Sequence, residues 1–267
     1  MFPYDLYLVR HGESDSNIAN SRSRRGDHSD FTPEFMNRHS ADLHLTHKGR
    51  AQAKAVGDWF RENTLAKCSA FCVSPYARAL ETASLLGLHN AEWNVDGRLR
   101  ERDHGSVDII PNNLRQERMV VHLKSLGLRP YHHFYTPLPA GESICDVTNR
   151  LQSVVDLLYQ ANARSIVIVA HGDVIRAFRV IFEEILPDYY HELMEKNSDD
   201  FKIGNGQIVH YTRCNAHSVS DYFSWVRSIN PWNPQYAGHD WRAVKSQLYS
   251  NEELMVLAER SKRLVAE

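Results

Sequence analysis

The chain has 267 residues, of which 42% are hydrophobic and 10% aromatic, enough to bury the core of one ordinary domain. A net charge of −2 excludes a broadly basic surface for nucleic acid or membrane. No apolar run has the length of a membrane span, residues 1–5 lack a secretory signal pattern, and the four scattered cysteines are typical of reduced, buried thiols. We therefore expect a cytoplasmic protein that binds neither nucleic acid nor membrane.

Short apolar runs alternate with amphipathic segments along the chain. The runs at residues 6–9, 70–73 and 166–170 predict strands, and the last has no polar alternation, as expected of a strand covered on both faces. Two later strands are predicted at residues 207–211 and 222–226. Strands that alternate with helices predict an α/β fold: a three-layer α/β/α sandwich around a mostly parallel sheet.

The predicted helices follow the apolar spacing. One begins after Thr46, a second has apolar residues at three- and four-residue intervals over 144–158, and a third runs from Asp173 to a point before Pro187. A further helix carries Arg78 in its first turns, after the strand at 70–73. From Trp241 onward we predict a helical tail, near residues 239–267.

Two polar segments interrupt this alternation, near residues 17–42 and 106–140. We predict that the whole chain, residues 1–267, is one domain and that these segments are loops inserted into it, the second acting as a cap over the site. The basic and aromatic residues of the second segment would favour a small anionic substrate. They are Arg115, Arg118, Arg129, Tyr131 and Tyr135.

Charged and imidazole side chains gather where the predicted strands end. Arg10 and His11 follow the first strand, His171 and Gly172 follow the strand at 166–170, and Arg78 lies just beyond the strand at 70–73. Since ligands bind beyond the carboxyl ends of the strands in open α/β sheets, these residues should meet at one edge. Arginine forks and the backbone N–H groups at a helix N-terminus bind phosphate, so the sequence predicts a phosphate pocket.

This combination of residue types fits phosphoryl transfer. A neutral histidine is a nucleophile near neutral pH, and arginines neutralise the oxygens of the transferring group. The leaving oxygen also needs a proton donor. We predict that Glu101, after a strand ending at Arg98-Leu99, is this acid, with Asp103 or Glu13 as the alternatives.

At this point the sequence resembles a known family. The matching segments are LVRHGES at residues 8–14, LTHKG at 45–49, SPYARA at 74–79, LRERDHG at 99–105, PAGES at 139–143 and VAHG at 169–172. They resemble, in the same order, the histidine phosphatase superfamily and its phosphoglycerate-mutase-like branch. The segment after Ser14 is longer than in a glycolytic mutase and lacks the tryptophan often found there, which favours a phosphatase.

The resemblance implies roles for individual residues. His11 would accept the phosphoryl group and Glu101 would donate the proton. Arg10, Arg78 and His171 would bind phosphate, with Asn17 and the backbone of Gly172 as further substrate contacts. It also implies that no metal ion and no organic cofactor take part.

Alternatives remain open at the sequence level. A phosphoglycerate-type mutase would return the phosphoryl group to a bound acid, and a non-catalytic module would use the same pocket to recognise phosphorylated ligands. Most of the fifteen histidines are interpreted as surface or core residues. His132-His133 is included, because adjacent side chains point in different directions and no ligand spacing follows in the sequence. The sequence leaves the natural substrate and the oligomeric state open.

Overall fold

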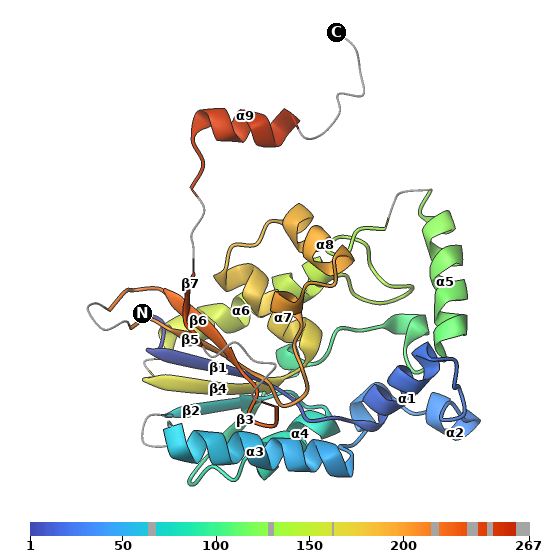
Figure 1. Ribbon diagram of the computed structural model, residues 1–267, viewed down its shortest axis with the longest axis horizontal. Coiled ribbons are helices and arrows are strands. Elements are labelled where there is room, and N and C mark those ends of the chain that lie inside the picture. The colour runs from blue at the N-terminus through green and yellow to red at the C-terminus, as the bar shows by residue number, and fades with distance from the viewer. Residues whose placement is uncertain are drawn as a thin grey trace.

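The computed structural model describes residues 1–63, 68–127, 131–161, 163–214, 219–233, 240–244 and 248–259. In these residues a seven-stranded sheet has the order β3-β2-β4-β1-β5-β6-β7, with helices on both faces (Figure 1). The strands are β1 Asp5–Arg10, β2 Ala70–Val73, β3 Trp93–Val95, β4 Ser165–Ala170, β5 Ile208–Thr212, β6 Trp225–Ile229 and β7 Arg242–Ala243. The helices are α1 Asp15–Arg24, α2 Pro33–Met36, α3 His47–Asn63, α4 Ala77–Leu85, α5 Asn112–Ser125, α6 Ile144–Gln160, α7 Gly172–Phe182, α8 Pro187–Glu195 and α9 Asn251–Glu259.

The sheet has a parallel part and an antiparallel part. Strands β3, β2, β4 and β1 run parallel, whereas β5 pairs antiparallel with β1 and is followed by β6 and β7. The parallel core confirms the predicted α/β fold. Because β1 and β4 are parallel neighbours in register from Asp5 opposite Ser165 to Arg10 opposite Ala170, the residues that follow them come out side by side.

Alternate residues of β1 form the two halves of the core. Leu6 and Leu8 pack with α6 and α7 on one face, and Tyr7 and Val9 pack with α3 and α4 on the other. The helix pairs lie on opposite sides of the sheet in Figure 1. All six residues of β4 are buried, which explains its unbroken apolar sequence.

The main predicted helices form where the sequence indicates. Thr46 begins α3 by accepting the backbone N–H of Gly49 on its hydroxyl at 3.0 Å. Ser143 and Asp146 form a capping box at the start of α6. His171 precedes α7 directly, so the N-terminus of α7 faces the strand ends.

Two strand predictions were wrong in position. The strand expected to end at Arg98-Leu99 is β3 and ends at Val95, because the Asp96 carboxylate accepts the Arg98 N–H at 2.8 Å and turns the chain into a 3₁₀ helix at Gly97–Leu99. The strand expected at 222–226 is β6, which begins three residues later because its pairing places Trp225 opposite Thr212.

The two segments interpreted as loops contain helices. The first holds most of α1 and all of α2, and the second holds α5. The predicted C-terminal helical tail begins instead with the short strand β7 and continues as α9, while parts of it lie outside the described residues.

Two expectations drawn from the composition can be compared with the structure. None of the four cysteines, all of them described, is part of a disulfide, but they are half-buried rather than buried. Within the described residues, no helix has both the length and the apolar character to cross a membrane.

Candidate active site

His11 lies directly after β1, where the parallel strands end. Its backbone N–H donates to the carbonyl of Ala170 at 3.0 Å. The ring Nδ1 lies 2.7 Å from the carbonyl oxygen of Gly12, and since a carbonyl only accepts, Nδ1 carries the hydrogen and Nε2 carries the lone pair. Burial, together with the positive charges of Arg78 and Arg10, holds the pKa of His11 well below its usual value. At neutral pH the ring is therefore an uncharged imidazole with a nucleophilic Nε2.

Two arginines, the buried Arg78 and the half-buried Arg10, flank this ring. Arg78, in the first turn of α4, donates from Nε to Nε2 of His11 at 3.2 Å and from Nη1 to the carbonyl of Ser40 at 2.5 Å. Arg10 donates from Nη1 to the carbonyl of Ile203 at 2.5 Å, and its buried Nε–H has no acceptor in the described part of the chain. Burial lowers the pKa of Arg10 to about 10, so it stays charged at neutral pH. An unused, buried N–H on a cation beside a nucleophile suits the oxygens of a phosphoryl group.

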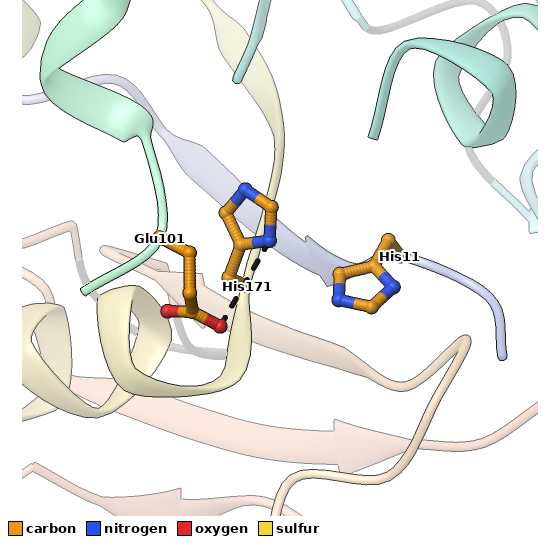
Figure 2. A group of neighbouring side chains, drawn as sticks. All are labelled: His11, Glu101 and His171. Atoms are coloured by element: carbon orange, nitrogen blue, oxygen red, sulfur yellow. Dashed lines mark ion pairs between the residues drawn. The ribbon is translucent and has the colours of Figure 1, made fainter. Parts of the chain in front are cut away.

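His171 lies beside His11 with its ring fully buried. The two ring centroids are 5.1 Å apart, and Glu101 lies close to both rings, with one polar atom of each of the three side chains within 4.8 Å of the others (Figure 2). Nε2 of His171 lies 2.7 Å from the Ser74 hydroxyl, while Nδ1 lies 3.9 Å from Glu101 Oε2 and has no hydrogen-bond partner in the residues described. Burial and the charge of Arg78 hold the pKa of His171 well below its usual value. The ring is therefore neutral, and a bound anion would favour its protonation.

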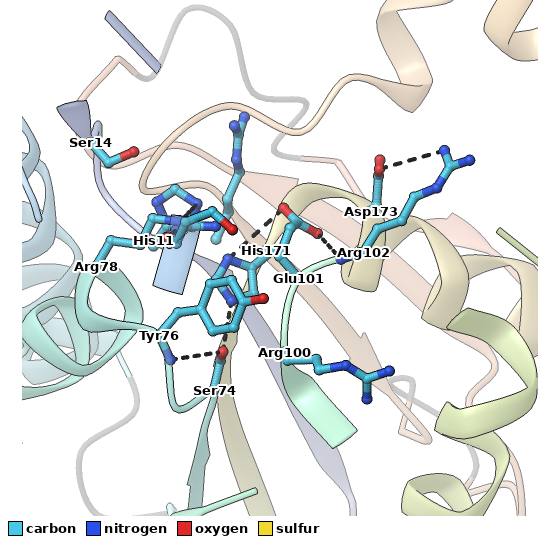
Figure 3. A network of polar contacts seen from close by, with 12 residues as sticks. His11, Ser14, Ser74, Tyr76, Arg78, Arg100, Glu101, Arg102, His171 and Asp173 are labelled. Atoms are coloured by element: carbon cyan, nitrogen blue, oxygen red, sulfur yellow. Dashed lines mark hydrogen bonds and ion pairs between the residues drawn. The ribbon is translucent and has the colours of Figure 1, made fainter. Parts of the chain in front are cut away.

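Glu101 and Asp173 are two carboxyl groups in different electrostatic surroundings. Glu101 lies between His171 and the ion pair of Arg102 with Asp173 (Figure 3). Burial and the negative charge of Asp173 raise the pKa of Glu101. Burial acts on Asp173 as well, but Arg176, 2.7 Å from its Oδ1, and Arg102 outweigh it and lower the pKa of Asp173. Glu101 thus suits a proton donor, while Asp173 stays a carboxylate.

The other two candidate acids have different partners. The Glu13 carboxylate is 2.9 Å from Nζ of Lys48 and accepts from the Thr46 hydroxyl at 3.2 Å. The Asp103 carboxylate accepts the backbone N–H of Gly105 at 2.7 Å. Both carboxylates thus already have hydrogen-bond or ion-pair partners in nearby loops and helices, which favours Glu101 as the proton donor.

Asn17 and Gly172 lie close to these residues. The side-chain oxygen of Asn17 accepts from the Ser14 backbone N–H at 3.1 Å and from Nδ2 of Asn205 at 3.0 Å. The same Asn205 nitrogen donates to the His11 carbonyl at 3.1 Å. Gly172 starts α7, and a Cβ added there would lie 3.6 Å from Nε of Arg10. Asn17 therefore braces the backbone around His11, and its contact with substrate stays a prediction.

Among the described residues, two groups have histidine and carboxylate atoms close enough to hold a metal ion. They are His11 with Glu101 and His171, and His133 with His191 and Glu195. The first group lies between the guanidinium groups of Arg10 and Arg78, whose positive charges disfavour a cation. That group therefore suits an anion such as phosphate.

Residues 6–199 match the family model of the histidine phosphatase superfamily, branch 1. The chain belongs to this superfamily. The match confirms the resemblance drawn from the motifs. A phosphoglycerate mutase-like protein of Arabidopsis thaliana is 27% identical over 255 residues, which cover 85% of this chain and 83% of that protein. An acid phosphatase of Mycobacterium tuberculosis is 32% identical over 174 residues, covering 64% and 72%.

Solved structures support the fold of this member of the superfamily. The mycobacterial glucosyl-3-phosphoglycerate phosphatase superposes with a TM-score of 0.57 at 22% identity, covering 90% of this chain and 96% of that one. The chain also matches a 6-phosphofructo-2-kinase/fructose-2,6-bisphosphatase of Caenorhabditis elegans, of which it spans 35%. With phosphatases and mutase-like proteins among its relatives, the chain is an enzyme of the phosphatase or mutase type.

Three residues of the candidate site were missed at the sequence level: Ser74, Arg102 and Asp173. Ser74, which follows β2, contacts His171, which follows the neighbouring strand β4. Asp173 and Arg102 form an ion pair beside Glu101, and Asp173 raises the pKa of Glu101. Each residue lies within or beside a motif. For Ser74 and Asp173 the available signal was a position close after a strand, and for Arg102 it was the motif at 99–105, but each role depends on contacts between distant segments.

The residues predicted to cap the pocket lie in different places. Arg115 on α5 donates to Asn20 of α1 at 3.0 Å, and the Arg118 guanidinium donates to the Ser106 carbonyl, so α5 is tied to α1 and to the chain after Glu101. Tyr131 and Tyr135 instead contact the His132-His133 pair, and Arg129 lies outside the described residues.

Proposed function

We propose that this enzyme is a phosphatase that hydrolyses a small-molecule phosphomonoester through a phosphohistidine on His11. The observation that carries the proposal is the neutral His11 ring, whose Nδ1–H is held by Gly12 and whose Nε2 faces Arg78. In-line attack on phosphorus needs such a lone pair and neutralisation of the phosphoryl oxygens. Both are supplied by residues of this chain, without a metal ion or organic cofactor.

In the first step, Nε2 of His11 donates its electron pair to phosphorus and the bond from phosphorus to the leaving oxygen breaks. The leaving oxygen takes the proton of Glu101, which becomes a carboxylate. Arg10, Arg78 and His171 bind the oxygens of the transferring group, with Asn17 and the Gly172 N–H as further proposed contacts. In the second step, water attacks phosphorus while Glu101 takes its proton, and the phosphorus–nitrogen bond breaks to release phosphate.

The leaving group would lie on the side of Arg102. This guanidinium is buried, and its Nη2 has no acceptor among the residues described. A buried guanidinium N–H without an acceptor favours a leaving group that carries its own negative charge. We therefore infer an anionic metabolite as substrate, in agreement with the sequence-level expectation.

The test is to trap the covalent intermediate. Wild type mixed briefly with ³²P-labelled phosphomonoester and quenched in alkali, where phosphohistidine survives, should carry the label on the peptide containing His11. His11→Ala should give a folded, unlabelled and inactive protein, with circular dichroism as the check on folding. A label on another residue, or most of the activity left in His11→Ala, would refute the mechanism.

Two assays separate the remaining alternatives. Steady release of inorganic phosphate without a bisphosphate primer is expected of a phosphatase, whereas a mutase needs the primer and transfers the group to a bound acid. Turnover of a generic aryl phosphate excludes a module that only binds phosphorylated ligands. The absence of turnover would favour that module.

A further inference from the structure

A second histidine cluster lies outside the catalytic site, where residues 131–136 pass α8 (Figure 1). His191 and Glu195 are four residues apart on α8 and so share one face of the helix. His133 reaches this face from residues 131–136. Its Nε2 lies 2.7 Å from Glu195 Oε1, and its ring centroid lies 5.4 Å from that of His191.

We propose that His133, His191 and Glu195 bind a Zn²⁺ ion that joins residues 131–136 to α8. One nitrogen of each ring and one carboxylate oxygen lie within 4.8 Å of one another. Tetrahedral Zn²⁺ with bonds of about 2.0–2.1 Å places its ligand atoms about 3.4 Å apart, so small side-chain rotations bring the three atoms onto one ion. Two imidazoles and a carboxylate are a donor set that Zn²⁺ prefers, and water completes the coordination.

The surroundings of this cluster favour a cation, in contrast to the catalytic group. The His132 ring stacks on His191 with centroids 4.5 Å apart, and its Nε2 lies 3.3 Å from the carboxylate of Asp188. Glu195 and Asp188 thus place two negative charges beside the imidazoles, with Arg102 as the arginine that acts on His133. His11, by contrast, has two arginines, Arg10 and Arg78, acting on it.

Zinc binding has a defined structural consequence at His191. Without metal, Nδ1 of His191 accepts the backbone N–H of His133 at 3.3 Å. Coordination of either ring nitrogen ends this long hydrogen bond. Zinc on Nδ1 displaces the amide, and zinc on Nε2 moves the ring hydrogen to Nδ1. The coordination bonds replace it as the link between the two segments.

The linked segment continues toward the acid. Beyond residues 131–136 the chain reaches Pro139, whose carbonyl accepts the Ser106 N–H at 2.9 Å, and Glu142, whose N–H donates to the Asp103 carbonyl at 2.9 Å. Zinc would therefore stabilise the segment that supports the Glu101 loop, without entering the reaction.

The experiment uses the full chain without a histidine tag, stripped with a chelator and dialysed. Titration with Zn²⁺ against a chromogenic chelator should show one bound ion per chain, and the melting temperature should rise with it. His191→Ala and the milder Glu195→Gln should lose both effects. Glu192→Gln on the same helix and His89→Ala at an exposed site are matched controls that should keep them.

A further comparison separates this site from the catalytic group. His11→Ala should bind Zn²⁺ as wild type does, and chelation should leave wild-type turnover at 25 °C unchanged. The proposal is overturned if wild type binds no Zn²⁺, if Glu195→Gln binds it like wild type, or if binding is lost only in His11→Ala.

Discussion

Glu101 and Asp173 show how two similar side chains acquire different protonation states. Both side chains are mostly shielded from solvent, but Asp173 has Arg176 and Arg102 as neighbours, whereas Glu101 has Asp173 as its main negative neighbour. Their pKa values therefore move apart, and the proton stays on Glu101. In the proposed mechanism this proton is the one that the leaving oxygen receives.

Glu101→Gln should slow the first step according to the leaving group. Glutamine keeps the shape but has no acidic proton, and a positioned general acid is typically worth about 10²–10⁴ in rate. An alkyl phosphate should show the full loss, because its alkoxide is strongly basic, and a nitrophenyl phosphate should lose much less. Single-turnover rates isolate this step from dephosphorylation. Equal losses for both substrates would mean that Glu101 is not the acid.

The pH profile of kcat/KM should be bell-shaped and acid-shifted. His11 must be neutral, so the rate rises as pH increases through its lowered pKa. Glu101 must be protonated, so the rate falls as pH increases through its raised pKa. Asp173→Asn removes the negative charge that helps to raise the pKa of Glu101, so the alkaline limb should move to lower pH. The acid limb should stay, because it is set by burial and by the charges of Arg78 and Arg10.

Asp103→Asn is the matched control for the pH experiment. Asp103 lies two residues from Glu101, but its side chain is exposed and its carboxylate accepts the Gly105 N–H. Its profile should follow wild type. An alkaline limb that moves equally in both variants would assign the effect to general surface charge.

At the scale of single residues, the sequence was informative where residue type and strand position coincide. His11, Arg10, His171 and Arg78 were placed together because each follows or lies just beyond a strand, and the structure brings them together. Asp173 could not be assigned a role in the same way. Asp173 is 72 positions from Glu101 in the sequence, and it affects the pKa of Glu101 only because the fold brings the two side chains together. The residues next to each of them in sequence do not reveal this contact.

At the scale of elements, α3 packs directly against the chain after His11. A Cβ on Gly49 would lie 2.0 Å from the Glu13 carbonyl oxygen, and a Cβ on Gly12 would lie 2.2 Å from the Gly49 carbonyl oxygen. Both obstacles are backbone atoms, which do not rotate away as side chains do. This contact fixes the position of the Gly12 carbonyl that orients the His11 ring.

Gly49→Ala should therefore lower both the free energy of unfolding and the turnover number. Overpacking of this kind costs about 1–3 kcal/mol, and the shift of Gly12 should lower kcat more than it raises KM. Gly97→Ala is the control, because a Cβ there meets no heavy atom within 4 Å. Urea unfolding and steady-state kinetics on both variants measure the two effects. If Gly49→Ala matches Gly97→Ala in both, the close contact has no role.

The elements that the sequence predicted correctly are those with a strong apolar pattern. The strand at β4 and the helices α3, α6 and α7 bury continuous or regularly spaced apolar residues. Helix α1 buries only Ala19 and Ser23, and α5 buries no residue, so neither has the spacing that distinguishes a helix from a polar loop. They were interpreted as loops for that reason.

At the scale of the whole molecule, α9 stands apart from the sheet and its helices (Figure 1). No residue of α9 is buried, and Leu254, Met255 and Val256 are more than half exposed. A chain ending at Val244 should therefore keep the melting temperature and the turnover number of the full chain. Thermal melts and phosphate release measure both. A clear fall in melting temperature would show that the removed residues contribute to the fold.

The position of β1 in the sheet has a consequence for how the protein is made. Its residues 5–10 are synthesised well before the residues with which they pair, 165–170 of β4 and 208–212 of β5. At a synthesis rate of about 5–20 residues per second, the apolar core of β1 waits roughly 10–40 s for its last partner. Until β4 is made the strand has two open edges, and until β5 is made it has one; such open edges favour misassembly and chaperone binding. The Gly206 N–H, which donates to the His11 carbonyl, is likewise synthesised long after His11, so the backbone around the proposed nucleophile is completed late.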